Sequence, residues 1–150
     1  MNYFKIFFIK GIPAGKPRPR SARIGNHLRI YQPDDAKGWA KLVALQARRY
    51  APDDPLTGPV AVNLTFVFPR PRAHFTKKGL RPDAPHYHTA KPDRDNLDKL
   101  ILDVFTRLGF WRDDAQVVRG TVLKLYTSFN YPHPGCWVDV ASLEGNLLPK

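Results

Sequence analysis

The sequence predicts an α+β fold with a small mixed β-sheet and two main helices, in a single domain over residues 1–150. Two patterns support this prediction. From Val60 to Phe68, apolar residues occupy alternate positions, which is the period of a half-buried strand. Over residues 97–108, apolar residues recur at spacings of three and four, which marks one apolar face of a helix. Helices inserted between strands are typical of α+β domains.

The length and composition fit one domain with its own core. The chain has 150 residues, of which 43% are hydrophobic and 25% charged, and this balance excludes a fibre or a wholly disordered chain. Its one cysteine, Cys136, excludes an intramolecular disulfide framework and favours a reducing compartment. No stretch approaches the roughly 18 apolar residues of a membrane span or shows a signal-peptide cleavage site. We therefore expect a cytoplasmic protein that does not act at a membrane.

The first third of the chain predicts a strand, a loop and a helix. Residues 3–10 are aromatic and β-branched and stop at Gly11, as expected of a strand that enters a turn. Residues 11–32 are rich in Pro, Gly and Arg and predict a loop with a small hairpin around residues 25–26. An aspartate at position 34 or 35 then caps a helix that ends before Pro52.

The remaining elements follow the strand at residues 60–68. Residues 69–91 are basic and proline-rich with little periodicity, so we predict a long loop there. The second helix runs from Asp95 to Leu108 and stops at Gly109. Residues 117–126 and 136–143 predict two further strands separated by a turn. We expect Trp39 and Trp137 in the core, because large aromatic rings are most simply buried.

The charge of the chain indicates a polyanionic partner. The sequence holds 24 Lys and Arg against 13 Asp and Glu, which gives a net charge of +11. Residues 1–33 contain seven bases and no acid. Six of the 13 acids nevertheless fall within residues 93–114, where they oppose the attraction of a polyanion. This concentration of acids calls for a chemical reason.

A divalent cation provides that reason. Asp93 and Asp95 lie just before the second helix, and Asp113 and Asp114 follow it. Carboxylates that converge at short range repel one another unless a cation such as Mg²⁺ is bound, and Mg²⁺ also meets substrate phosphate. Bases that hold a nucleic-acid backbone, around acids that hold a metal ion, are typical of a metal-dependent nuclease.

Simpler roles for these residues remain open. Aspartates before a helix are common N-caps, and Asp95 with Asp98 resembles a capping box. Lys99 lies four residues from both Asp95 and Asp103, so it could join a surface ladder of ion pairs. Asp98 points elsewhere on the helical wheel and is expected to be solvated.

The length of the second helix separates the two groups of acids. A helix of about 13 residues rises about 20 Å, so Asp113 and Asp114 begin at the end remote from Asp93. Only a fully extended return of the linking residues could bring them back. Otherwise a second subunit must supply them. We hypothesise a twofold dimer that places Asp113 and Asp114 of one chain beside Asp93 and Asp95 of the other.

Basic residues before the acids are predicted to contact phosphate. The string Pro-Arg-Pro-Arg occurs at residues 17–20 and 69–72 and gives two rigid basic arms. The predicted contacts in and near these arms are Lys16, Arg18, Arg20, Arg70, Arg72 and Lys91. The alternative is that these are solvated loop charges without a partner.

Three segments resemble the RusA family of Holliday-junction resolvases. Lys-Pro-Asp-Arg-Asp-Asn-Leu-Asp-Lys at 91–99, Asp103, and Asp-Asp-Ala-Gln-Val at 113–117 are similar to the central signature of that family. Gly-Ile-Pro at 11–13, with Lys16, Arg-Pro-Arg at 18–20 and Tyr31, resembles its N-terminal signature. Lys124 fits the basic position in the strand that follows.

The resemblance implies a homodimeric, Mg²⁺-dependent endonuclease from a bacterium, prophage or phage that cuts two strands of a four-way DNA junction symmetrically. It assigns the catalytic acids to Asp93, Asp95 and Asp114 and a functional lysine to Lys99. A water activated by the metal would attack the scissile phosphate and leave a 5′-phosphate and a 3′-hydroxyl.

The resemblance also implies residues that support these groups. Asp113 would be a further metal ligand or a neighbour of one. Asn96 would hydrogen-bond a ligand carboxylate, and Asp103 belongs to the same surroundings. Two other functions remain open: a metal-dependent nuclease for other branched DNA, and a non-catalytic basic DNA-binding protein whose acids are helix caps.

Overall fold

The structure is a computed structural model that describes residues 2–16, 20–24, 27–31 and 34–143, with side chains described for residues 2–16 and 35–143. Its main element is a five-stranded sheet in the order β1-β9-β4-β7, with β8 also paired to β4. β9 runs antiparallel to both β1 and β4, whereas β7 and β8 run parallel to β4. The predicted mixed sheet is therefore confirmed. The bounds of these strands are Phe4–Lys10 for β1, Val60–Phe68 for β4, Val117–Arg119 for β7, Val122–Tyr126 for β8 and Gly135–Ser142 for β9.

Strand β4 lies in the interior of the sheet and carries much of the core. The predicted alternation is visible at Leu64 and Phe66, which are buried, and at Asn63, which is not. At both ends of β4 the residues between the predicted core positions are buried too, including Ala61 and Val67. The sequence prediction of a strand with one buried face therefore holds only for its middle.

The predicted single strand over residues 117–126 is wrong, because two strands occupy it. β7 and β8 pair with successive parts of β4 and are separated at Gly120. A Cβ atom at Gly120 would lie 1.7 Å from the carbonyl oxygen of Val62. The backbone amide of Thr121 donates to Asn63 Oδ1 at 3.0 Å instead of continuing the ladder. The break thus comes from a close backbone approach that only glycine allows.

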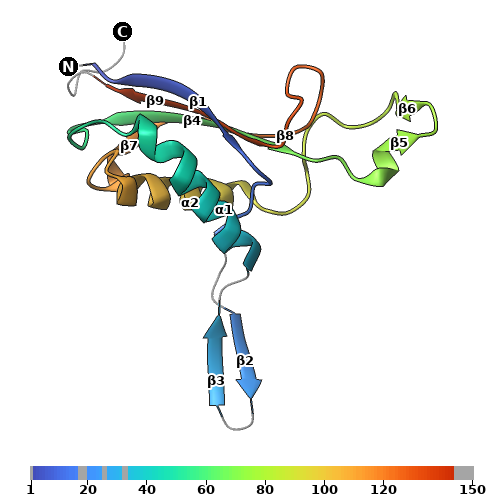
Figure 1. Cartoon of the computed structure of the whole chain (residues 1–150), viewed down its shortest axis with the longest axis horizontal. Helices are drawn as coiled ribbons and strands as arrows, with labels where there is room; N and C mark the ends of the chain where they lie inside the picture. Colours follow the sequence, from blue (N-terminus) through green and yellow to red (C-terminus); the bar gives the residue numbers. More distant parts are fainter. Residues whose placement is uncertain (1, 17–19, 25–26, 32–33, 144–150) are drawn as a thin grey trace.

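Two helices cover one face of the sheet (Figure 1). Helix α1 spans Asp34–Ala47, as predicted, and continues into a short 3₁₀ helix, η1, at Arg48–Tyr50. Helix α2 spans Arg94–Leu108 and buries Leu97, Leu100, Ile101, Val104 and Phe105. It ends at Gly109, whose φ of 85° is the left-handed conformation that glycine adopts readily.

The opposite face of the sheet is not covered by a helix in the part of the chain that the structure describes. On β1, Phe4 and Ile6 are exposed while Phe7 and Ile9 are buried, because successive side chains of a strand point to opposite faces. On β9, Trp137 lies on the open face with 42% of its surface exposed. The expectation that Trp137 belongs to the core is therefore wrong, whereas Trp39 is buried as expected.

Two hairpins extend from this body. β2 (Arg20–Ile24) and β3 (His27–Tyr31) form the predicted hairpin, whose turn at residues 25–26 lies outside the described residues (Figure 1). The predicted loop at 69–91 contains a second hairpin, made of β5 (Phe75–Thr76) and β6 (Gly79–Leu80), after the 3₁₀ helix η2 (Arg72–His74). Short hairpins of this kind have too few residues to show a hydrophobic period.

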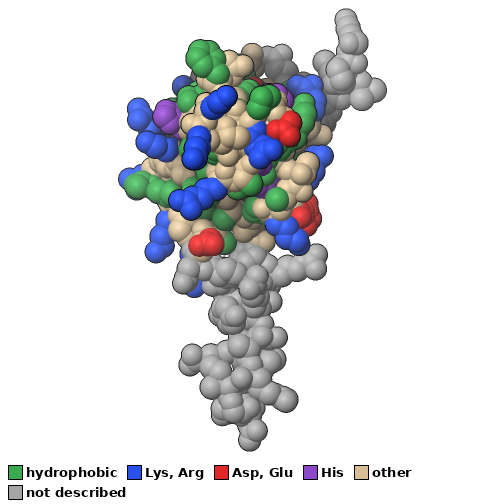
Figure 2. All heavy atoms as spheres, turned by 90° about the vertical axis from the view of Figure 1, so that its right-hand side faces the viewer, with side chains coloured by type: hydrophobic (Ala, Val, Ile, Leu, Met, Phe, Trp, Pro, Cys, Tyr) green, Lys and Arg blue, Asp and Glu red, His purple; other side chains and the backbone are tan. Residues whose placement is uncertain are grey.

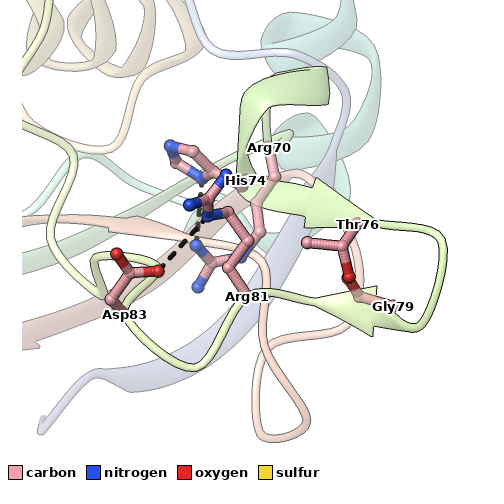
Figure 3. A network of polar contacts seen from close by, with 6 residues as sticks. All are labelled: Arg70, His74, Thr76, Gly79, Arg81 and Asp83. Atoms are coloured by element: carbon pink, nitrogen blue, oxygen red, sulfur yellow. Dashed lines mark hydrogen bonds and ion pairs between the residues drawn. The ribbon is translucent and has the colours of Figure 1, made fainter.

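Arg70 fixes the start of this loop by internal contacts. Its guanidinium lies 3.1 Å from Nδ1 of His74 (Figure 3). The same group donates to the carbonyl oxygens of Thr127 and Pro85 at 2.8 and 2.7 Å. It also lies 5.3 Å from the centre of the Tyr126 ring, within the range of a cation–π interaction. Figure 2 shows this end of the molecule, where Lys and Arg side chains spread over the surface among few acids. No helix among the described residues has the length and apolarity needed to span a membrane.

Candidate metal and nucleic-acid site

The first pair of predicted acids lies at the start of α2. Asp93 is the residue before the first helical residue, with an extended φ of −70° and ψ of 150°, but its side chain makes no capping hydrogen bond. Asp95 follows in the first turn, and both side chains are exposed. Asp95 is inside the helix, so it does not begin a capping box with Asp98. The capping alternative therefore does not explain Asp93 or Asp95, whose carboxylates face solvent.

The segment before α2 is held against β8. The backbone amide of Tyr126 donates to His86 O at 2.9 Å, and that of His88 donates to Lys124 O at 3.0 Å. The Lys124 ammonium then donates to the carbonyl oxygen of Ala90 at 2.7 Å. Burial lowers the pKa of Lys124, and the negative charge of nearby Asp93 acts in the opposite direction. The family resemblance marks Lys124 as a basic position, but its contact with Ala90 depends on the strand pairing that brings β8 to the start of α2.

The second pair of acids follows α2 on a segment anchored in the core. Trp111 is buried, and its indole Nε1–H donates to Thr106 Oγ1 at 2.7 Å. Asp113 then caps the 3₁₀ helix η3 (Asp114–Gln116), since its Oδ1 accepts from Ala115 N at 2.8 Å. Gln116 Oε1 accepts from the backbone amide of Asp113 at 3.1 Å, which completes a capping box. For Asp113, then, the capping alternative is what the structure shows.

Asp114 lies near enough to Asp98 for its charge to act on that carboxyl group. Burial raises the pKa of Asp98, Arg94 lowers it, and the negative charge of Asp114 raises it further. Asp98 is half-buried, so the expectation of a solvated side chain is wrong. The segment after α2 therefore turns back along the helix within one chain, so that Asp114 acts on Asp98 without a second subunit. Over the described ranges, no three His, Cys, Asp or Glu side chains gather closely enough within the chain to hold a metal ion.

The flank of α2 that faces α1 carries an ion pair. Lys16 donates its backbone amide to Asn96 O at 2.9 Å, and its ammonium pairs with the Asp103 carboxylate. A Cβ atom at Gly15 would lie 2.9 Å from Asn96 Cβ, so the chain passes close over the helix here. The Asp103 carboxylate is therefore engaged in an ion pair with Lys16. Lys99 is exposed and forms no ion pair with a described residue, so the alternative of an ion-pair ladder with Asp95 and Asp103 is not formed among those residues.

The residues predicted to contact phosphate differ in whether their side chains are exposed or already engaged in contacts within the protein. Arg72 and Lys91 are exposed, whereas Lys16 is paired with Asp103 and Arg70 is occupied by the contacts that hold its loop. Arg18 lies outside the described residues. Arg20 begins β2, but its side chain is not described. The internal contacts of Arg70 favour a structural role for that residue.

A basic mixed α+β domain with acids at both ends of one helix defines a class of candidate DNA-processing proteins, and sequence comparison identifies the family. The family model described as "Endodeoxyribonuclease RusA" matches residues 10–132. The chain belongs to the RusA family of endodeoxyribonucleases, as the resemblance indicated.

Relatives of the chain include one of unassigned role and several resolvases. "Uncharacterized protein YqaN" of Bacillus subtilis (strain 168) is 31% identical over 124 residues, which cover 81% of this chain and 87% of that protein. "Crossover junction endodeoxyribonuclease RusA" of Escherichia coli (strain K12) is 54% identical over 33 residues, 22% of this chain and 28% of that protein. The protein of the same description from Enterobacteria phage 82 matches over the same lengths and at the same identity.

Proposed function

We propose that this protein is a Mg²⁺-dependent, structure-specific endodeoxyribonuclease that resolves four-way (Holliday) DNA junctions by paired symmetric cleavage. The observation that carries the proposal is the pair of carboxylates of Asp93 and Asp95, which are exposed and make no capping hydrogen bond. They lie on a chain whose net charge is +11. Membership of the RusA family supports the reaction class. The phage and bacterial relatives support a role in the cytoplasm of a bacterium, encoded by the host or by a phage.

The donor set fits magnesium. Asp93, Asp95 and Asp114 have exposed side chains that make no hydrogen bond or ion pair with other described residues, so their oxygens are free for a cation. Carboxylate oxygens are the ligands that Mg²⁺ takes in proteins. When bound, the ion would polarise the scissile phosphate and lower the pKa of a water. Asp113 keeps one oxygen in its cap and would act as a neighbour of Asp114.

The protein residues position the substrate around these acids. Lys91 and Arg72 would contact backbone phosphates, and Lys99 would approach the charge that develops on the reacting phosphate. The Lys124 ammonium donates a hydrogen bond to the carbonyl oxygen of Ala90 and so fixes the path of the backbone that leads to Asp93. Asn96 is tied to Lys16 through its backbone carbonyl, which leaves its side-chain amide to hydrogen-bond a ligand carboxylate.

A homodimer would bring the two pairs of acids together. Within one chain, the described residues provide no metal-binding group of three. A second copy related by a twofold axis can place its Asp114 beside Asp93 and Asp95, and two such sites would cut two strands symmetrically. Dimerisation is thus part of the proposal, and its test is the mass of the protein in solution with and without junction DNA.

The decisive experiment is digestion of a synthetic mobile four-way junction with and without Mg²⁺, beside three-way and linear DNA of the same sequences. We expect paired nicks in the four-way junction that require Mg²⁺, and loss of these nicks in Asp95→Asn with junction binding retained. Equal cutting of three-way DNA would favour a nuclease for other branched DNA. Binding without any nicking would favour a non-catalytic DNA-binding protein and would overturn the proposal.

A further inference from the structure

A groove of about 780 Å³ lies between α1 and α2 and reaches Asp113 and Asp114, but its lining includes neither Asp93 nor Asp95. Small or apolar side chains from both helices, Ala36, Ala40 and Leu100, line it. Thr106 and charged residues, among them Lys16, Asp103 and Asp113, complete the lining. Lys37 and Lys41 come from α1, and Arg107, Arg112 and Asp114 come from the end of α2 and the segment after it.

The cations of the groove are available for a ligand. Lys37, Lys41, Arg107 and Arg112 are all exposed, and none forms an ion pair with another residue whose side chain is described. Basic residues that only keep a protein soluble are not expected to gather around one groove between two helices. Their mutual repulsion is relieved when an anion lies between them.

The acids of the groove do not cancel this charge. Asp103 is neutralised by its pair with Lys16, and Asp113 has one oxygen in the cap of η3. Asp114 is the one acid of the lining that forms no hydrogen bond or ion pair with a described residue. The groove is therefore lined by four cations without an ion-pair partner among the described residues and by one free carboxylate.

The arrangement of the cations suits an extended polyanion. Lys37 and Lys41 lie one turn apart on α1, about 6 Å along the axis, and so form a row on one wall. Arg107 and Arg112 provide charge on the other wall, where guanidinium groups can bind phosphate with two hydrogen bonds. The small side chains of Ala36 and Ala40 leave room between the walls for a sugar–phosphate strand.

We propose that the α1–α2 groove binds the phosphodiester backbone of one DNA arm, with Lys37, Lys41, Arg107 and Arg112 as phosphate contacts, and leads that strand to Asp114. This inference rests on the proposed function, because it takes DNA as the substrate. It adds a binding surface on α1, a helix that the sequence analysis gave no functional role.

The test measures the salt dependence of junction binding in full-length double variants. Each phosphate contact contributes about 0.9 to the slope of log K against log salt, so losing two contacts lowers the slope by about 1.8. We expect this decrease in Lys37→Gln/Lys41→Gln and, independently, in Arg107→Gln/Arg112→Gln. The change in affinity between 50 and 200 mM salt should then be about 12-fold smaller than in the wild type.

Arg48→Gln is the matched control, because Arg48 is an exposed base on η1 beyond the groove and should leave the slope unchanged. Slopes equal to that of the control in both double variants, with melting temperatures preserved, would overturn the inference. Loss of dimerisation with an unchanged slope would also overturn it, by showing that the groove contacts a second copy. Lower slopes in a protein that never nicks DNA would support the groove and reject the nuclease.

Discussion

The ammonium of Lys124 donates a hydrogen bond of 2.7 Å to the carbonyl oxygen of Ala90, three residues before Asp93. The same strand, β8, accepts the backbone amide of His88 through the carbonyl of Lys124. β8 therefore holds the segment before α2 by both its backbone and a side chain. The place at which α2 begins, and with it the direction of Asp93, depends on this attachment.

Replacing Lys124 by Met should reduce junction cleavage more than junction binding. The methionine fills similar space but cannot donate to Ala90 O, so the approach to Asp93 loses a hydrogen bond worth about 1 kcal/mol. We expect single-turnover cleavage to fall about 5-fold, which corresponds to about 1 kcal/mol. Lys124→Arg keeps a donor and is the control. Wild-type cleavage in Lys124→Met would contradict a positioning role for this lysine.

Asp113 and Asp114 are neighbours with opposite predicted behaviour. Asp113→Ala removes the cap of η3 and should lower the free energy of unfolding by about 1 kcal/mol, whereas Asp113→Asn keeps an acceptor and should restore it. Asp114→Asn removes no described hydrogen bond and should leave stability unchanged while cleavage falls more than about 100-fold. Urea denaturation and nicking assays on the same preparations measure both effects. A reversed pattern would show that Asp113 is the ligand.

His88 should make the protein lose stability in mild acid. Its ring stacks on Phe68 with 3.8 Å between centres, and burial, with a smaller effect of the Lys124 charge, lowers its pKa below the ordinary value of about 6.5. The unfolded chain therefore binds more protons between the two pKa values. The stabilisation is fully present above about pH 6.5 and is lost as the pH falls below that value.

Urea denaturation between pH 5 and pH 7.5 tests this prediction. His88→Phe keeps an aromatic ring against Phe68 and should show a smaller loss of stability toward low pH than the wild type. The control is His133→Gln, because His133 is exposed and its replacement should leave the wild-type pH dependence in place. Equal pH dependence in the wild type and in His88→Phe would reject His88 as the titrating group.

Thr106 should stabilise the segment that carries Asp113 and Asp114. Its hydroxyl accepts the indole Nε1–H of Trp111 at 2.7 Å and donates to Leu102 O at 2.8 Å. Thr106→Val leaves a buried indole N–H without its acceptor and should cost about 1–3 kcal/mol in the free energy of unfolding. Thr106→Ser keeps the hydroxyl and should cost less. Equal midpoints of unfolding for Thr106→Val and Thr106→Ser would show that the Thr106 hydroxyl contributes nothing to stability.

The sequence predicted those elements that carry a complete hydrophobic period. β4 and α2 lie where their apolar spacing placed them, and Gly109 ends α2 as expected. The break between β7 and β8 depends on how closely Gly120 approaches Val62, which no local pattern records. The size of an aromatic ring does not tell which face of a sheet is covered, so the sequence alone does not place Trp137 on the open face.

The site was predictable in its residue types and only partly in its arrangement. The placement of Asp93 and Asp95 at the start of α2 follows from the helix pattern alone. The proximity of Asp98 to Asp114 requires the path of the chain after Gly109, and the use of Asp103 by Lys16 requires the path before α1. Both relationships are tertiary contacts between different segments of the chain, and the hydrophobic pattern of each segment carries no information on them.

The position of β9 between β1 and β4 has a consequence for how the molecule is made. The backbone amide of Tyr3 donates to Ser142 Oγ across 139 positions of the chain, and residues 135–142 supply the partner for both neighbouring strands. During synthesis, β1 and β4 must wait unpaired on that side until the ribosome has released β9. Contacts this distant in sequence slow folding, so we expect the sheet to close late, after both helices have formed.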